Sequence, residues 1–488
     1  MCAAAFLLLS RHFNWGIAMQ LKRTLNRIET VALSVAVIAM TVGMALNTPF
    51  VAAASGAAVP LVYIISTVGV LCIALSFVRL ASKIGHAGSV YGLIRYAQGR
   101  NPGFIAGWAL LLTYTLFIAS ALFGFGLFAS MLFDPIVKIA WPVYSVACGI
   151  LVWWVTYRDI KLSTRLMLSI EFLSILLLII VAMVILHKQP ASAVPFQVGG
   201  AGIVGISQGL VFGVMTFIGF EAAASLGEES RNAFRDVPFA IVATVLIGGA
   251  FFTFVSYAQT IGFGLDNVKA FAAAATPMND LTSHYLGEPF NVAIKSGALI
   301  SNLAMAVGSA SAASRLLLAL ARDGFLPRPL ASINSFGSPK LATHLVMALN
   351  MGLVTILPFV VPSASDLYGY VSTIATLTVL IAYGMMNLAT LTHFARQDVQ
   401  TGKPYRLVPP IIGLLLSAYV LFANVYPVPA APFSMFPYVA AAYMLIGGAI
   451  MFLSTRKDSS RAMDAYLFHR VTPSIDDATQ EVEGRSQA

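Results

Sequence analysis

The stretch Phe212-Gly-Val-Met-Thr-Phe-Ile-Gly-Phe-Glu-Ala-Ala-Ala-Ser-Leu-Gly-Glu-Glu-Ser-Arg-Asn-Ala-Phe-Arg-Asp-Val-Pro238 decides the fold of this chain. It begins inside an apolar segment long enough to cross a bilayer, and that segment contains glycine and a carboxylate, Glu221. At about 1.5 Å per helical residue, Glu221 lies about 10 Å below the aqueous loop that carries Glu228. Because a charge at membrane depth costs at least ~2.5–3.5 kcal/mol, Glu221 predicts a compensating substrate, proton or ion.

Composition supports the same class of protein. The chain has 488 residues, of which 58% are hydrophobic and 10% are charged, whereas soluble domains average about 25% charged. Apolar runs recur almost to the C-terminus, so we predict an all-α polytopic membrane protein without a soluble domain. Cys2, Cys72 and Cys148 show no metal or disulfide spacing. No metal or cofactor is therefore expected.

About 12 transmembrane helices are predicted from these apolar runs. Their ranges are about 31–54, 58–82, 103–132, 139–157, 165–187, 204–227, 238–263, 291–321, 341–362, 367–393, 409–427 and 433–454. The loop 264–290 is expected to hold a short surface helix near Ala270–Ala275. Residues 1–30 form a predicted cytoplasmic tail, in which 1–18 are read as a misassigned start before Met19. Residues 31–455 form the predicted helical domain, and 456–488 form a polar, disordered cytoplasmic tail.

The net charge of +9 is a topology signal and not a nucleic-acid footprint. With the N-terminus inside, the Lys and Arg residues left on the outer side are Lys138, Lys188, Lys269 and Lys295. This distribution follows the positive-inside rule and predicts that both termini are cytoplasmic.

Two spans carry helix-weakening residues in corresponding places. The first contains Val37-Ile-Ala-Met-Thr-Val-Gly-Met-Ala-Leu-Asn-Thr-Pro49, and the sixth contains Gly213 and Gly219 beside Glu221. The odd offset between these spans predicts inverted repeats whose discontinuous helices form a midplane site. At such breaks the N–H ends suit a carboxylate, and the C=O ends suit an ammonium group or a cation. The alternative is that the glycines serve close helix packing and that Pro49 is only a kink.

Several motifs, in order and spacing, resemble those of bacterial amino acid permeases of the amino acid–polyamine–organocation superfamily. They are Ala87-Gly-Ser-Val-Tyr91, Gly103-Phe-Ile-Ala-Gly-Trp108, Phe217-Ile-Gly-Phe-Glu221, Gly227-Glu-Glu229, Arg235-Asp-Val-Pro238 and Ser314-Arg-Leu-Leu-Leu-Ala-Leu-Ala-Arg-Asp-Gly-Phe-Leu-Pro327. The resemblance covers nearly all the spans. It implies a bacterial inner-membrane protein with alternating access and a five-plus-five inverted repeat. The repeats would be about 31–187 and 204–393, followed by two extra helices at about 409–454.

The resemblance also implies a substrate site at the two breaks. The substrate carboxylate would dock on the unwound first span and the amine on the unwound sixth. Mapped onto this chain, the carboxylate site is Val42, Gly43, Met44 and Ala45, and the amine site is Thr216, Phe217 and Gly219 beside Glu221, with Phe220 and Tyr114 as aromatic gates.

Two departures from the family pattern bear on the substrate. The first-span motif reads Val42-Gly43-Met44 and is poor in glycine, so its backbone approaches a carboxylate less closely. The substrate is then either an amine without an α-carboxylate or one that binds differently. Arg79 stands where the family commonly has a glutamate. Because it can reach the cytoplasmic interface, we interpret it as topological or structural.

Other charged and polar residues in the spans leave alternatives open. Glu171 is either a proton carrier or one half of an ion pair with Arg79 or Arg315. Glu221 either contacts the substrate amine or couples to a proton, unless it caps the second half of the sixth helix. The charges Glu228, Glu229, Arg231, Arg235 and Asp236 are interpreted as a solvated inner-loop network. Ser301, Asn302 and Ser309 either line the pathway or make interhelical contacts.

These features favour a secondary transporter of an amino acid or a related organic amine, driven by protons or by exchange. The same architecture also serves polyamine, small-amine or inorganic ion cotransport. A channel is less favoured because no filter sequence is evident. ATP-driven transport is disfavoured by the lack of a phosphate-binding loop motif, and an enzyme by the scattering of the seven His residues. The predicted partners are a small-molecule substrate and the lipid bilayer, with the oligomeric state open.

Overall fold

The computed structural model describes residues 26–82, 90–158, 164–221, 230 and 232–455. Within these ranges the chain consists of helices joined by turns and loops, with an isolated β-bridge between Ile333 and Pro339. The all-α prediction is therefore confirmed. The predicted start at Met19 and the polar C-terminal tail lie outside the described residues.

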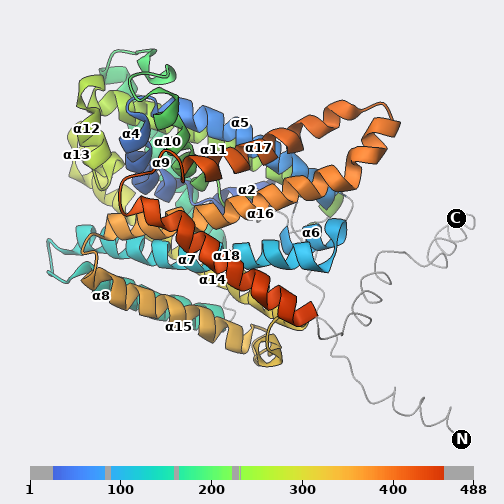
Figure 1. Cartoon of the computed structure of the whole chain (residues 1–488). Helices are drawn as coiled ribbons and strands as arrows, with labels where there is room; N and C mark the ends of the chain where they lie inside the picture. Colours follow the sequence, from blue (N-terminus) through green and yellow to red (C-terminus); the bar gives the residue numbers. More distant parts are fainter. Residues whose placement is uncertain (1–25, 83–89, 159–163, 222–229, 231, 456–488) are drawn as a thin grey trace, which may run out of the picture.

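The helices follow one another along the chain with short connections (Figure 1). Their bounds are α2 Arg27–Val37, α3 Met40–Val42, a π-helix Gly43–Asn47, α4 Thr48–Ser55, α5 Val59–Ala81, α6 Val90–Gln98, α7 Arg100–Phe133, α8 Trp141–Tyr157, α9 Thr164–Lys188, α10 Gly202–Met215, α11 Ala233–Phe263, α12 Val268–Ala273, α13 Pro277–Leu286, α14 Glu288–Arg322, α15 Lys340–Ile356, α16 Ala364–Gln400, α17 Val408–Ala423 and α18 Phe436–Thr455.

The described part of the chain contains 9 helices that are long and apolar enough to cross a membrane. They are α5, α7, α9, α11, α14, α15, α16, α17 and α18. The shorter apolar helices α8 and α10 occupy the predicted fourth and sixth spans. The first predicted span holds α2, α3, the π-helix and α4. The chain is thus a multi-pass membrane protein, while the number of crossings and the inverted repeat stay predictions.

Helix α7 lies at the centre of the bundle and packs against α14 and α16. Its buried residues recur all round the helix, as expected for a helix enclosed by others. Helices α8 and α15 run side by side along one flank, and α11 packs against α5 (Figure 1). This arrangement brings side chains of α7 and α16 to the end of α10.

Three short helices lie outside the predicted spans. Helix α12 confirms the surface helix expected near Ala270–Ala275, and α13 follows it at the same end of the molecule as α4 (Figure 1). Helices α6 and α13 were not predicted, because each is too short and too polar to give a hydropathy signal. In α6 a single apolar face, with Val90, Leu93 and Ile94, is buried, and the helix packs on α7.

Candidate functional site

The first span breaks at Ile38 and Ala39. Helix α2 ends at Val37, and Ala39 has φ 52° and ψ 56°, which is left-handed. Ala39 is the one non-glycine residue with positive φ in the described ranges. An L-residue adopts this conformation at a cost of roughly 1–2 kcal/mol, so the surrounding structure must hold the break in place. The helix resumes at Met40.

The predicted carboxylate-binding residues lie after this break, in a continuous helical run. Val42, Gly43, Met44 and Ala45 are all buried. The Gly43 N–H donates to the carbonyl of Ala39 at 3.1 Å, so this N–H is used within the span. The Met44 carbonyl accepts from Gln259 Nε2 at 2.8 Å. The role of these residues in binding stays a prediction, but the helix break itself comes before these residues in the chain.

The sixth span breaks after Met215, where α10 ends. Tight turns follow: the Phe217 N–H donates to Val214 O at 3.0 Å, and Ile218 N–H to Met215 O at 3.1 Å. Gly219 has φ 109°, which side-chain-bearing residues rarely adopt. The chain therefore leaves the helix between Gly213 and Gly219, the two glycines on which the predicted break rests. The second half of this span, from 222 to 229, lies outside the described residues.

Glu221 sits directly after the break and is buried. Its carboxylate accepts from the hydroxyl of Tyr383 on α16 at 2.8 Å and from that of Tyr114 on α7 at 3.2 Å. It also accepts from the Gly219 N–H at 3.0 Å. The Gly219 N–H precedes Glu221 in the chain, and the donors of our capping alternative, which follow Glu221, lie outside the described residues.

The aromatic residues around Glu221 divide into two roles. Tyr114, a predicted gate, contacts the carboxylate itself. Phe220, the other predicted gate, is fully buried, and its ring centroid lies 5.4 Å from those of both Phe77 and Tyr383. Sequence reasoning missed Tyr383. Its only signal is a polar hydroxyl inside an apolar span, which many tyrosines share.

The two broken spans touch each other. Asn47 Nδ2 donates to Thr216 Oγ1 at 3.0 Å, and the Tyr368 hydroxyl donates to Asn47 Oδ1 at 3.0 Å. A Cβ on Gly43 would come within 2.6 Å of the Thr216 side chain, so glycine is what permits this approach. Phe217 packs edge-on against Phe252, at 5.0 Å between centroids. The structure therefore brings together Gly43 and Thr216, which were assigned to different halves of the site.

Glu171 reaches the first-span break from α9. Its Oε1 accepts the N–H of Thr41 at 3.1 Å, and the carboxylate is buried. The hydroxyls of Thr41 and Ser301 lie beside it and have no other hydrogen-bond partner within the described ranges. Asn302, on the same helix as Ser301, donates to Ala298 O of its own helix at 2.8 Å. Ser309 is half-buried and stays unassigned.

The predicted ion pair between Glu171 and Arg79 is wrong. Arg79 instead pairs with Asp398 at 2.6 Å, donates to the Arg406 carbonyl at 2.9 Å and lies 4.4 Å from the Phe394 ring centroid. These groups line a cavity of about 520 Å³ at the ends of α5 and α16. The contacts support the structural interpretation of Arg79, because they tie α5 to α16 and to the start of α17. The Arg315 alternative for Glu171 stays open.

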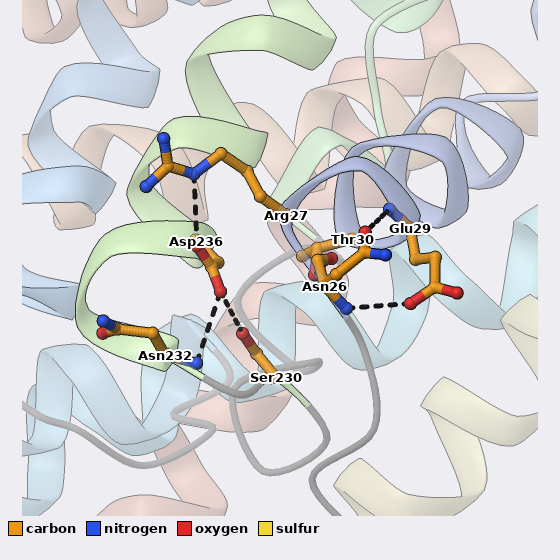
Figure 2. Close-up of polar contacts among 7 residues, drawn as sticks. All are labelled: Asn26, Arg27, Glu29, Thr30, Ser230, Asn232 and Asp236. Atoms are coloured by element: carbon orange, nitrogen blue, oxygen red, sulfur yellow. Dashed lines mark hydrogen bonds and ion pairs between the residues drawn. The ribbon is translucent and has the colours of Figure 1, made fainter.

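Asp236 corrects the interpretation of the inner-loop charges as solvated. It is buried and pairs with Arg27 Nε at 3.2 Å, and it accepts from Ser230 Oγ at 3.1 Å and Asn232 N at 3.3 Å (Figure 2). Arg27 opens α2, and Asn26 and Glu29 cap that helix reciprocally, each side chain accepting the other residue's N–H (Figure 2). The pair thus joins the starts of α2 and α11. Arg235 is exposed, whereas Glu228, Glu229 and Arg231 lie outside the described residues.

The separate sequence motifs also meet in space. Arg95 of α6 pairs with Asp323 at the end of α14 and donates to the Tyr91 hydroxyl at 3.3 Å. Arg100 at the start of α7 donates to the Asp323 carbonyl at 2.7 Å. Tyr91 of the Ala87–Tyr91 motif and Asp323 of the Ser314–Pro327 motif therefore belong to one polar cluster.

Comparison with known proteins identifies the family. A family profile described as "Amino acid permease" matches residues 25–450. The branched-chain amino acid permease BcaP of Bacillus subtilis is 27% identical over 463 residues, which cover 90% of this chain and 94% of the relative. The low-affinity putrescine importer PlaP of Escherichia coli is 25% identical, over 69% of this chain and 73% of the relative. A methylthioribose transporter of Bacillus subtilis is 22% identical, over 90% and 95%.

The profile covers most of the chain, and the all-helical fold with a break in the first span and another in the sixth agrees with it. The chain therefore belongs to the amino acid permease family.

Proposed function

We propose that this protein is a secondary transporter that carries a primary amine, as an amino acid or a related organic amine, across the bacterial inner membrane by alternating access. The observation that carries the proposal is the buried carboxylate of Glu221 at the break of the sixth span. Two tyrosines from different helices hold it in one orientation. A carboxylate held in this way is a ready partner for a substrate ammonium group.

The electrostatics of Glu221 favour this assignment. Its described partners are two hydroxyls and backbone N–H groups, all of them neutral. Glu221 follows the C-terminal end of α10, whose partial negative charge also favours a cation. A substrate ammonium would supply the opposite charge that the neutral donors do not.

The relatives support a substrate with an amino group without deciding which one. The names of two of them refer to branched-chain amino acids and to putrescine, which share a primary amine. The methylthioribose relative shows that membership in the family does not by itself determine the substrate. For this chain the argument for an amine therefore rests on Glu221.

Alternating access is supported by links on both sides of the breaks. Arg27 and Asp236 join α2 to α11, and Asn47 joins the other half of the first span to Thr216. If the termini are cytoplasmic, as the charge distribution favours, the first link lies on the inner side and the second towards the outer side. We propose that transport breaks these links in turn. Glu171 and Glu221 are the candidates for proton coupling.

Counterflow in liposomes that contain the purified protein tests the function. The substrate panel consists of amino acids, diamines and monoamines, and Glu221→Gln is compared with wild type. We expect saturable exchange for wild type and its loss, or a reduction of at least about tenfold, for Glu221→Gln, because an amide attracts an ammonium group far less. Glu288→Gln is the matched control, since Glu288 is exposed at the end of α14.

The controls separate the alternatives. Both variants must match wild type in yield and in size-exclusion profile, so that a loss of exchange reports on the site. Wild-type affinity and turnover in Glu221→Gln would refute the role of Glu221. Ion currents without saturable exchange would favour a channel, and exchange of inorganic ions alone would favour ion cotransport.

A further inference from the structure

We propose that Glu171 occupies the anion-binding position at the first-span break, and that the substrate is therefore an amine without an α-carboxylate. The inference rests on the proposed function, and it names the substrate class. It starts from one contact, the hydrogen bond from the Thr41 N–H to Glu171 Oε1 at 3.1 Å.

The N-terminal end of a helix at this break is a place where an anion would bind. The helical run from Met40 continues through the π-helix and α4 to Ser55, so it is long enough to carry a partial positive charge at its start. The first N–H groups of such a run have no partner within the helix. Thr41 lies in this first turn, and its N–H faces a carboxylate of the protein itself.

Further along the run, the backbone is less suited to a substrate carboxylate. The Gly43 N–H is already used by Ala39 O at 3.1 Å. Met44 presents its backbone carbonyl, which accepts from Gln259. A carbonyl oxygen would repel a substrate carboxylate. Both Thr41 and Glu171 are buried, so the contact is part of the packed interior. An incoming substrate carboxylate would have to displace Glu171 or lie against a like charge.

The charges of the two breaks lead to the same conclusion. Glu171 lies at the first break and Glu221 at the second, and their described hydrogen-bond partners are neutral. A zwitterionic amino acid brings no net charge to this region, whereas an amine without a carboxylate brings a positive one. The buried hydroxyls of Thr41 and Ser301 lie beside Glu171 and have no other hydrogen-bond partner within the described ranges. They can accept from an ammonium donor.

Pairs of compounds that differ only by the carboxylate test the proposal. Leucine is compared with 3-methylbutylamine, and ornithine with 1,4-diaminobutane, as competitors in liposome counterflow. Wild type is expected to prefer the amine of at least one pair by at least about tenfold, the equivalent of one hydrogen bond to a charged group. In Glu171→Ala, which frees the Thr41 N–H, this preference should fall by about tenfold or reverse, because the amino acid gains affinity.

A second variant keeps the test decisive if Glu171→Ala does not fold. Glu171→Gln retains an acceptor for the Thr41 N–H and removes only the charge, so it should lower the preference less than Glu171→Ala does. Glu288→Gln should leave the preference unchanged. If wild type exchanges the amino acids as well as the amines, or if neither Glu171 variant alters the ratio, the proposal is overturned. If none of the compounds is exchanged, the proposed function is contradicted instead.

Discussion

Asn47 of the first span donates a 3.0 Å hydrogen bond to Thr216 at the end of α10, and this bond links the two broken spans directly. Tyr368 holds the other side of the Asn47 amide at 3.0 Å, and the Tyr63 hydroxyl lies 3.4 Å from Thr216 Oγ1. All four side chains are buried. A movement of one broken span must therefore either carry the other along or break this cluster.

Thr216→Val is expected to weaken the contact between the broken spans. Valine has nearly the shape of threonine but cannot accept from Asn47, which leaves a buried amide without its partner at a cost of about 1–3 kcal/mol. The melting temperature of the purified protein should fall, as followed by thermal size-exclusion analysis. Thr216→Ser keeps the hydroxyl and should stay close to wild type. Equal loss in both variants would mean that the methyl group, packed near Gly43, contributes as much as the hydroxyl.

Gly219→Ala should impair transport because of backbone strain. With φ at 109°, a Cβ at this position is unfavourable by about 1–3 kcal/mol, and the turn that presents Glu221 would shift. Counterflow rate and melting temperature should both drop. Gly352→Ala in α15 is the control, since a Cβ there has open space and its φ is not in the left-handed region. A wild-type rate in Gly219→Ala would show that the turn tolerates a shift.

Tyr383→Phe tests how Glu221 is oriented. The variant removes the 2.8 Å hydrogen bond to the carboxylate and leaves the ring that packs on Phe77 and Phe220. We expect a rise in the substrate concentration at half-maximal uptake of about threefold to thirtyfold, from the loss of one buried hydrogen bond. Tyr114→Phe, at 3.2 Å, should have a smaller effect. The reverse order would place the substrate on the Tyr114 side.

The pH profile of uptake tests Glu171 as a proton carrier. Glu171→Gln cannot titrate, but it can still accept from the Thr41 N–H. If Glu171 takes up the coupled proton, uptake in the variant should lose its dependence on external pH between about 5 and 8 while exchange at a fixed pH persists. An unchanged profile would remove Glu171 from the coupling step and leave Glu221 as the candidate.

The ion pair between Arg27 and Asp236 should hold the start of α2 against the start of α11. The Arg27 side chain is about half exposed, with 51% accessible, so the ion pair itself contributes only about 0.5–1 kcal/mol. Asp236→Asn is nonetheless expected to speed the reaction of a thiol reagent with a cysteine introduced nearby on α11. The reason is that the start of α2 is no longer held against α11. A double-mutant cycle with Arg27→Gln should show coupling between the two changes. Additive effects would argue that Asp236 acts mainly through Ser230 and Asn232.

The class of the protein and the places of its two breaks were predictable from the sequence. Bilayer thickness imposes a fixed length on apolar spans, and hydropathy is summed over neighbours in the chain. Gly219 could be recognised because its conformation is a property of one residue. Glu221 could be recognised because a buried charge in a span needs a partner, whichever partner that is.

The identity of the partners was decided only by the tertiary structure. Tyr383 meets Glu221 across 162 positions of the sequence, Glu171 meets Thr41 across 130, and Arg79 proved to pair with Asp398 across 319. Asp236 stands next to the exposed Arg235 in the sequence, and its burial and its pairing with Arg27 of α2 distinguished it from a surface charge. The sequence alone thus determined the membrane fold and which residues are costly to bury. Helix packing decided which partner each of these residues has. Contacts between spans depend on the rotation and the spacing of the helices, which hydropathy does not encode.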